Sequence, residues 1–164
     1  MSKKELNAYE DFEAFYERHW KYVFRLCFTY MNNIADAEDC AQDVFVKVLK
    51  NHYQFKDNMH ERKWLTITSM NLCINKLNSY YHRNIVSVED DGIPELVTPE
   101  TTDYSDVLEA VIHLPPKLKE VIWLYYYEGY STKEIAVLLN RPPSTIRNQM
   151  RDARNLLKTV LEER

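Results

Sequence analysis

The stretch EGYSTKEIAVLLNRPPSTIRNQMRDAR, residues 128–154, contains the clearest structural signal in the sequence. Apolar residues at helical spacing lie on both sides of a bend at Asn140–Pro143, so the stretch predicts two short helices joined by a tight turn. Ser131 and Glu134 have the spacing of a capping box, which predicts where the first of these helices begins. Ser144 is the predicted N-cap of the second helix.

This pair of helices has the pattern of a helix-turn-helix, in which the second helix enters the major groove of DNA. The inward positions that would lock the two helices together are Ile135, Leu138, Ile146 and Met150. The outward positions can donate to base edges or phosphates, and they are Thr145, Arg147, Asn148, Gln149, Arg151 and Arg154. The alternative interpretation is an ordinary helical hairpin whose arginines are solvated. The motif alone does not separate a repressor from other DNA-binding proteins.

The composition indicates a helical protein of the cytoplasm. Glycine is scarce, with two residues, while 45% of the residues are apolar and 28% charged. No apolar run approaches the roughly 20 residues that cross a bilayer, and the N-terminus lacks the apolar core of a signal peptide. The three cysteines, Cys27, Cys40 and Cys73, each lie within an apolar helical pattern. They are predicted to be buried, reduced thiols.

Charge alternates along the chain. Residues 41–84 have a net charge of +4 and residues 111–164 of +3, whereas residues 85–110 contain eight acidic and no basic residues. Basic blocks suit a polyanionic partner. From residue 86 to 106 the helical periodicity disappears and two prolines and a glycine occur, which predicts a flexible linker. The linker is either a solvated tether or a mimic of nucleic acid inside a basic cleft.

The remaining pattern predicts an all-α fold of two helical domains joined by this acidic linker. The predicted domains are residues 1–84 and 107–164, with the linker at 85–106. In the first domain the apolar spacing predicts a helix at 8–31 and a second helix that begins after an N-cap at Asn33. The apolar stripe of the second helix is Ala37, Ala41, Val44, Phe45 and Val48.

A third helix is predicted from about Glu61 to His82, with a buried face made of Trp64, Ile67, Thr68, Asn71, Leu72 and Ile74. In the second domain, helical periodicity returns at Asp106. Pro116 then suits the first turn of the following helix, and Gly129 suits the position just past its end.

Two stretches of the first domain predict binding surfaces. In DAEDCAQDVFVKVLKN, residues 36–51, the side chains of Asp36, Asp39, Gln42 and Asp43 lie on adjacent turns beside an exposed Phe45 or Val46. In FKDNMHERKWLTITSMNLCINKL, residues 55–77, aromatic side chains alternate with basic and amide ones, as unpaired bases require. The members are Phe55, Lys56, Arg62, Lys63, Trp64, Asn71, Asn75 and Lys76. The alternative is a core tryptophan surrounded by solvated charges.

Three motifs together resemble the extracytoplasmic-function (ECF) sigma factors of bacterial RNA polymerase. They are DAEDCAQDVFVKV, RKWL…NLCINKL and LPPKLKEVIWLYYYEGYSTKEIAVLL…STIRNQMRDAR. They occur in order over nearly the whole chain. The resemblance implies a sigma region 2 domain, then a sigma region 4 domain. It also implies three partners. The first is core RNA polymerase, bound through its clamp helices and flap. The others are promoter DNA and an anti-sigma factor.

The resemblance also implies three sites. The polymerase-binding site comprises Asp36, Glu38, Asp39, Gln42, Asp43 and Phe45. The site that opens and reads the minus-ten element comprises Phe55, Lys56, Asp57, Asn58, Arg62, Trp64, Asn71, Asn75, Lys76 and Arg83. The site that reads the minus-thirty-five element comprises Ser131, Lys133, Ser144, Thr145, Arg147, Asn148, Gln149, Arg151 and Arg154.

The chain differs from the family at four positions. Gln149 and Asp152 replace residues that are usually basic, and Thr66 and Ser69 make the third helix more polar. Asp152 has no cation three or four residues away and is therefore predicted to repel phosphates, to orient an arginine or to read a cytosine.

The predicted function is that of a sigma factor that binds core RNA polymerase and directs promoter recognition and transcription initiation. A stand-alone helix-turn-helix regulator and a polymerase-binding adaptor without DNA readout are the alternatives. No catalytic pair, metal-ligand set or phosphate-binding glycine loop occurs in the sequence, so no enzymatic activity, cofactor or metal ion is predicted.

Overall fold

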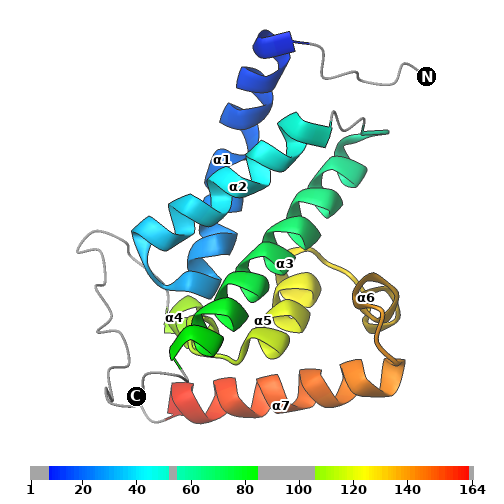
Figure 1. The fold of residues 1–164 in the computed structure, drawn as a ribbon. Helices are drawn as coiled ribbons and strands as arrows, with labels where there is room; N and C mark the ends of the chain where they lie inside the picture. The colour runs from blue at the N-terminus through cyan, green and yellow to red at the C-terminus, as the bar shows by residue number, and fades with distance from the viewer. Residues whose placement is uncertain (1–7, 52–54, 85–105, 163–164) are drawn as a thin grey trace. The chain divides into compact units, whose positions relative to one another are not determined.

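The computed structural model describes residues 8–51, 55–84 and 106–162, and within these ranges the chain forms helices and no strand. The chain divides into two compact units, Met1–Thr98 and Pro99–Arg164. Helices α1 to α3 belong to the first unit and α4 to α7 to the second (Figure 1). The predicted all-α fold class is confirmed.

The predicted linker, residues 85–106, lies outside the described residues except for Asp106, where α4 begins. The predicted domain boundaries therefore stay a prediction. None of the described helices is long and apolar enough to cross a membrane.

The first unit is built from α1 (Ala8–Met31), α2 (Ile34–Asn51) and α3 (Asn58–Asn84). Each of the three helices packs against the other two. The three therefore enclose one common core, to which every helix contributes an apolar face.

A two-residue break separates α1 from α2 because Asn32 adopts a left-handed conformation, with φ of 52°. The backbone N–H of Asn32 still donates to the carbonyl of Phe28, at 2.8 Å, which closes the last turn of α1. The side-chain oxygen of Asn33 accepts from the backbone N–H of Asp36 at 3.0 Å. This bond satisfies one of the free donors at the start of α2, so the predicted N-cap is confirmed.

The core of the first unit contains one cysteine from each helix. Cys27, Cys40 and Cys73 are free and fully buried, as predicted. Hydrogen bonds between these thiols, together with burial, raise the pKa of Cys40 and Cys73 above the ordinary value, so both remain protonated and unreactive. The predicted apolar stripe of α2 is also buried, from Ala37 to Val48.

The predicted buried face of α3 was wrong. The helix begins at Asn58, three residues before the predicted start, and Asn71 is exposed. The residues that enter the core are Leu65, Thr66, Ser69, Met70 and Cys73. Two hydroxyl residues can be buried here because each donates to a backbone carbonyl four residues earlier, Thr66 to Arg62 at 2.8 Å and Ser69 to Leu65 at 2.6 Å. A pattern that counts only apolar residues misplaces such a face.

The second unit begins with α4 (Asp106–Ile112) and α5 (Pro116–Ile122). Pro116 occupies the first turn of α5, as predicted. The helix then continues as a π-helical turn, η1 (Trp123–Tyr127), which the sequence analysis did not predict. Gly129 follows with φ of +74°, the left-handed conformation that ends a helix and that glycine adopts without strain.

The helix-turn-helix consists of α6 (Thr132–Leu139) and α7 (Pro143–Glu162). The predicted capping box is present: the Ser131 hydroxyl accepts from the backbone of Glu134, whose carboxylate accepts from the backbone of Ser131. Asn140 ends α6 in the left-handed conformation. Ile146 and Met150 of α7, which were predicted to point inward, are buried, and Ala153 is buried with them.

The predicted cap at Ser144 was wrong. Because α7 begins at Pro143, Ser144 already lies inside its first turn. The backbone N–H of Ile146 instead bonds the carbonyl of Pro142. Proline suits this first helical position because its missing N–H would have no partner within the helix.

Candidate nucleic-acid interface

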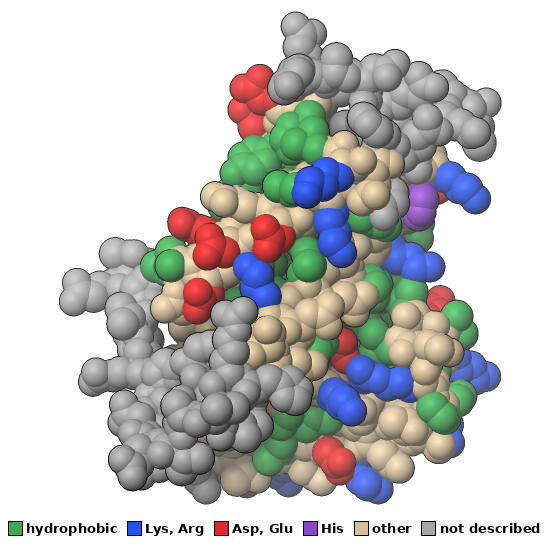
Figure 2. All heavy atoms as spheres, viewed as in Figure 1, with side chains coloured by type: hydrophobic (Ala, Val, Ile, Leu, Met, Phe, Trp, Pro, Cys, Tyr) green, Lys and Arg blue, Asp and Glu red, His purple; other side chains and the backbone are tan. Residues whose placement is uncertain are grey.

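One face of α2 is strongly acidic. All five predicted polar residues of this helix are exposed, namely Asp36, Glu38, Asp39, Gln42 and Asp43. Between them, Ala37, Cys40 and Ala41 point into the core, which fixes the orientation of the helix. Figure 2 shows acidic side chains gathered over the beginning of α2. Only Asp36 lies in the first turn, so the helix dipole does not account for the others.

Phe45 does not belong to this exposed face, and its predicted place in the polymerase-binding site is corrected. Its side chain is 3% exposed and packs against aromatic rings of α1, with the ring of Tyr16 centred 4.8 Å away and that of Phe15 6.0 Å away. Val46 is the exposed neighbour, at 40%. The sequence predicted that either Phe45 or Val46 is exposed beside the acidic residues, and the exposed residue is Val46.

Lys76 lies beside the acidic face of α2. Its ammonium group is 3.1 Å from a carboxylate oxygen of Asp43. Partial burial opposes the charge of Lys76, but the bond to Asp43 and the neighbouring acid Asp39 outweigh it and raise the pKa of Lys76. Lys76 is fourteen residues from Arg62, about 21 Å along the helix. The predicted minus-ten set is therefore not gathered at one point.

Phe55 is a core residue, which corrects its predicted role as a surface for base stacking. Its side chain is 4% exposed. The ring stacks on Phe15 at 5.8 Å with an interplanar angle of 3°, and the edge of Trp64 meets it at 5.7 Å. Trp64 itself is half-buried. The alternative interpretation placed a tryptophan in the core, but the aromatic residue that is fully buried here is Phe55.

The loop before α3 is fixed by its own polar groups. The backbone N–H of His60 donates to Asp57 Oδ1 at 2.8 Å, which caps α3, and the backbone N–H of Lys56 donates to His60 Nδ1 at 3.1 Å. Lys56, Asp57 and Asn58 are exposed, as a DNA-binding loop requires. Met59 is 78% exposed and was missed, although an apolar residue among polar ones is a signal that the sequence contained.

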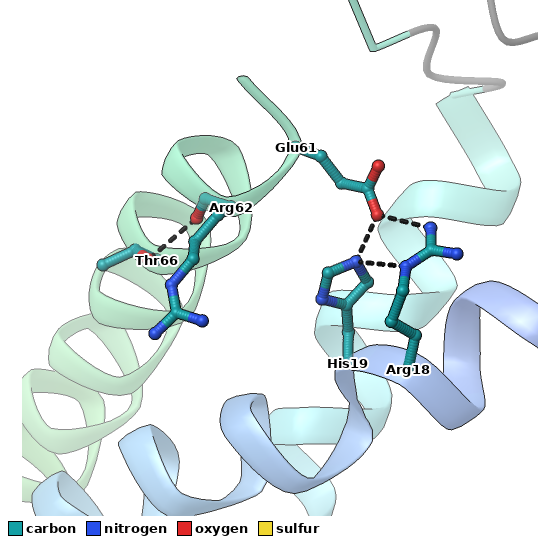
Figure 3. A network of polar contacts seen from close by, with 5 residues as sticks. All are labelled: Arg18, His19, Glu61, Arg62 and Thr66. Atoms are coloured by element: carbon teal, nitrogen blue, oxygen red, sulfur yellow. Dashed lines mark hydrogen bonds and ion pairs between the residues drawn. The ribbon is translucent and has the colours of Figure 1, made fainter. Parts of the chain in front are cut away.

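A polar network joins the first turn of α3 to α1 (Figure 3). The carboxylate of Glu61 is almost fully buried and bonds both Arg18, at 2.6 Å, and His19. Burial lowers the pKa of His19, and this effect exceeds the opposing effect of Glu61. Burial alone would raise the pKa of Glu61, but the bonds from Arg18 and His19 hold it below the ordinary value. At neutral pH the network is therefore a carboxylate, a guanidinium and a neutral imidazole.

These pKa shifts predict that acid destabilises the chain. A lowered folded pKa means that the unfolded state binds the proton more tightly, so stability falls as pH drops below the ordinary value of the group. For His19 the loss begins near pH 6.5 and for Glu61 near pH 4.5. We expect His19→Gln to flatten the loss between pH 7.5 and 5.5 in urea unfolding. Equal slopes in wild type and variant would contradict this assignment.

The solvent face of α3 presents two amides. Asn71 and Asn75 are exposed. Arg62 is nine residues from Asn71, which is two and a half helical turns, so its side chain starts on the opposite side of α3. The predicted set is thus divided between the solvent face and the side near α1. Arg83 lies in α3, and its side chain is outside the described residues.

In the second unit, α7 exposes five of the predicted residues, Ser144, Arg147, Asn148, Arg151 and Arg154. Ser131 and Lys133 are also exposed at the start of α6, while Thr145 is half-buried. This arrangement places the N-terminal half of α7, with its cations and amide, at the surface. It is the half that contacts bases in a helix-turn-helix.

Gln149 is part of a brace inside the second unit. Its side-chain oxygen accepts from Arg141 at 3.1 Å, and Arg141 also pairs with the buried carboxylate of Glu120 in α5. Burial raises the pKa of Glu120, and the opposing charge of Arg141 does not cancel this effect. An uncharged acceptor at position 149 satisfies Arg141, whereas a basic residue would repel it. This explains one departure from the usual pattern.

Two further side chains of α7 have partners within the second unit. The carboxylate of Asp152 lies 3.5 Å from the guanidinium of its neighbour Arg151, which agrees with the predicted alternative that Asp152 orients an arginine. Arg154 donates to the hydroxyl of Tyr126 at 3.1 Å and lies 5.5 Å from the ring centroid of Tyr125. Arg154 is therefore held toward η1, away from the N-terminal half of α7.

Comparison with known proteins identifies the two units. The family model for Sigma-70 region 2 matches residues 15–82, and that for Sigma-70 region 4 matches residues 104–157. The ECF RNA polymerase sigma factor SigL of Mycobacterium tuberculosis is 29% identical over 160 residues, which cover 92% of this chain and 88% of SigL. The chain belongs to the ECF sigma factors. SigW of Bacillus subtilis, another ECF RNA polymerase sigma factor, is 24% identical over 99% of this chain and 94% of SigW.

Solved structures agree with the fold of this sigma factor. The sigma factor RpoE of Bartonella quintana, in complex with the anti-sigma factor NepR, matches 94% of this chain and 98% of its own, with a TM-score of 0.67 and 19% identity. CnrH, in complex with the cytosolic domain of CnrY, matches 96% and 91%, with a TM-score of 0.59 and 18% identity. The function is that of an RNA polymerase sigma factor, and a stand-alone regulator is not favoured.

Proposed function

We propose that this sigma factor docks on core RNA polymerase through α2 and that its two units divide promoter recognition between them. The observation that best supports docking is the acidic face of α2, defined as Asp36, Glu38, Asp39, Gln42 and Asp43 with the exposed Val46. Its charge exceeds what a helix needs for its own stability, and it is built on a helix whose other face is locked in the core. Such a rigid charged surface suits a basic protein partner, here the clamp helices of core RNA polymerase.

The minus-ten element is assigned to the loop Phe55–His60 and the solvent face of α3. Opening a promoter without ATP requires the protein to bind single-stranded DNA better than duplex. Flipping a base costs a few kcal/mol, which stacking and edge contacts in a shaped site offset. The exposed Lys56 and Asn58 of the loop and the amides Asn71 and Asn75 of α3 provide contacts of this kind.

The minus-thirty-five element is assigned to α7. Arg147, Asn148 and Arg151 project from a helix whose N-terminus is set by the turn at Asn140 and by the Glu120–Arg141–Gln149 brace. Arginine pairs with guanine in the major groove, and asparagine with adenine. The partners proposed for the whole chain are core RNA polymerase, through its clamp helices and flap, promoter DNA and an anti-sigma factor. We further propose that the chain acts in the cytoplasm and has no enzymatic activity of its own.

Transcription in vitro tests this function directly. Core RNA polymerase with the sigma factor is expected to start transcripts at a defined promoter, and core polymerase alone is not. A helix-turn-helix repressor would instead bind a palindromic operator as a dimer without polymerase. Operator binding without any initiation would contradict the proposal.

Asn71→Ala is expected to impair strand opening without loss of stability. Because Asn71 is exposed, its removal should change the free energy of unfolding by less than about 0.5 kcal/mol. Reactivity of promoter thymines with permanganate should fall several-fold in open complexes. Asn51→Ala serves as the matched control, since Asn51 is an exposed amide of the same unit at the end of α2, outside the proposed site. Equal permanganate reactivity in both variants would remove Asn71 from the site.

A further inference from the structure

Helix α1 exposes a row of cations that belongs to none of the three sites above. Arg18, Lys21 and Arg25 are all exposed. Residues three, four and seven apart lie on one side of a helix, so these side chains form a single stripe. The exposed acids of the helix, Glu13 and Glu17, precede it. The sequence analysis overlooked the stripe because the net charge of residues 1–40 is negative.

A fourth cation comes from α3. The guanidinium of Arg62 lies over the ring of Tyr22, 3.8 Å from its centroid. Tyr22 is one turn from both Arg18 and Arg25, so Arg62 is placed between their positions on the helix. Burial is the main cause of the lowered pKa of His19, and the charges of Arg18 and Arg62 both add to it.

The stripe concentrates positive charge that the described part of the chain only partly balances. Arg18 pairs with Glu61, whereas Lys21 and Arg25 form no ion pair with any described residue. Like charges one turn apart on a helix repel each other and destabilise it. The fold holds these cations together despite their repulsion. Such an arrangement favours binding of a polyanion, because binding neutralises the cations and releases counterions from the polyanion.

Polar contacts fix the tyrosine beneath Arg62. The hydroxyl of Thr66 donates to the backbone carbonyl of Arg62 at 2.8 Å, so the hydroxyl of Tyr22, 2.7 Å from Thr66 Oγ1, is the donor in their shared bond. Thr66 is buried, and Glu61, next to Arg62, is anchored to α1 by Arg18 and His19 (Figure 3). Stacking uses the flat face of a guanidinium, while its N–H donors lie in the plane of the group. A stacked arginine is therefore already ordered before a phosphate arrives.

We propose that the α1 stripe, defined as Arg18, Lys21, Arg25 and Arg62, binds the phosphate backbone of promoter DNA, and that Tyr22 is the positioning residue for Arg62. The stripe adjoins the first turns of α3, which directly follow the loop assigned to the minus-ten element. This proposal rests on the proposed function only because its ligand is promoter DNA. It adds α1 to the surface that follows the DNA strand beside the opened bases.

The first test compares Arg25→Gln with Arg25→Lys in the complete holoenzyme. Promoter binding is measured by fluorescence anisotropy over a series of salt concentrations. Arg25→Gln should reduce the slope of log affinity against log salt by about 0.7 to 0.9, the value for one lost phosphate contact. Arg25→Lys keeps the charge and should keep the wild-type slope. Lys117→Gln, at an exposed cation of the second unit outside every proposed site, should also leave the slope unchanged.

The second test asks whether Tyr22 acts through Arg62. Tyr22→Leu and Arg62→Ala are each expected to weaken promoter binding about three- to five-fold, as loss of a cation–π contact predicts. The double variant should be no weaker than Arg62→Ala, because the two changes remove one contact. Tyr22→Leu combined with Lys63→Ala should instead show additive losses. Tyr22→Phe keeps the ring and should bind the promoter almost as well as the wild type. If Tyr22→Leu does not fold, Tyr22→Phe decides the matter: a loss as large as that of Arg62→Ala would mean that the ring of Tyr22 does not position Arg62.

The outcomes separate the stripe from the proposed function. If the wild-type holoenzyme does not initiate transcription, the proposed function fails. If it initiates and Arg25→Gln leaves the salt slope unchanged, the stripe alone is overturned. A loss of affinity for core polymerase rather than for DNA would show that the stripe binds protein, which also overturns the proposal. Additive losses for Tyr22→Leu and Arg62→Ala would remove the positioning role of Tyr22.

Discussion

Asp39→Arg is expected to lower the affinity of this sigma factor for core RNA polymerase at least tenfold. Asp39 is exposed at the centre of the acidic face of α2, with Asp36 one turn before it and Asp43 one turn after it. Reversing its charge places a cation against a basic partner and removes an attraction that the neighbouring acids reinforce. A tenfold loss corresponds to about 1.4 kcal/mol, within the range for charged pairs at interfaces.

The matched control is Glu13→Arg. Glu13 is an exposed acid of α1 in the same unit, and its reversal changes the net charge by the same amount. Affinity for core polymerase is measured with the labelled chain by fluorescence anisotropy, and urea unfolding verifies that both variants are folded. Gln42→Ala should give a smaller loss than Asp39→Arg. If Asp39→Arg and Glu13→Arg bind core polymerase equally well, the docking face on α2 is wrong.

Three helix ends were predictable because their signals are local, whereas the starts of α3 and α7 were misplaced. Asn33 supplies a cap to a backbone N–H three residues away, Ser131 and Glu134 satisfy each other, and Gly129 adopts a conformation that few other residues tolerate. Each of these effects depends on fewer than five consecutive residues. The acidic face of α2 was predictable for a similar reason, since its buried and exposed positions alternate with the helical period.

Contacts between distant residues were not predictable in this way. Phe55 was assigned to DNA because aromatics among cations suggest base stacking, yet Phe15, forty residues earlier, covers its ring. Gln149 was regarded as a departure from the family, but its partner Arg141 lies in the turn between α6 and α7. In both cases the local sequence shows which interactions a side chain can make, whereas the fold decides which residue it contacts.

The same brace leads to the largest expected change in stability. Arg141→Ala should destabilise the second unit by about 3–5 kcal/mol, because it leaves the carboxylate of Glu120 buried without its cation. Binding to the minus-thirty-five element should be lost with it, since Arg141 also holds Gln149 of α7. Urea unfolding of the full chain measures the loss, with Lys158→Ala as the control at an exposed lysine of α7.

The pH dependence of the destabilisation by Arg141→Ala distinguishes a buried carboxylate without a cation from a general loss of packing. Burial already raises the pKa of Glu120 above its ordinary value of 4.5, and removal of Arg141 should raise it further. When the folded pKa of an acid is the higher one, the unfolded state releases its proton first, so stability falls as pH rises between the two values. The destabilisation by Arg141→Ala should therefore be smaller at pH 5 than at pH 8. The double variant Glu120→Gln with Arg141→Met, which removes both charges, should recover most of the stability and lose this dependence. A penalty that is the same at both pH values would mean that the lost contacts of the arginine stem, rather than the charge of Glu120, destabilise the unit.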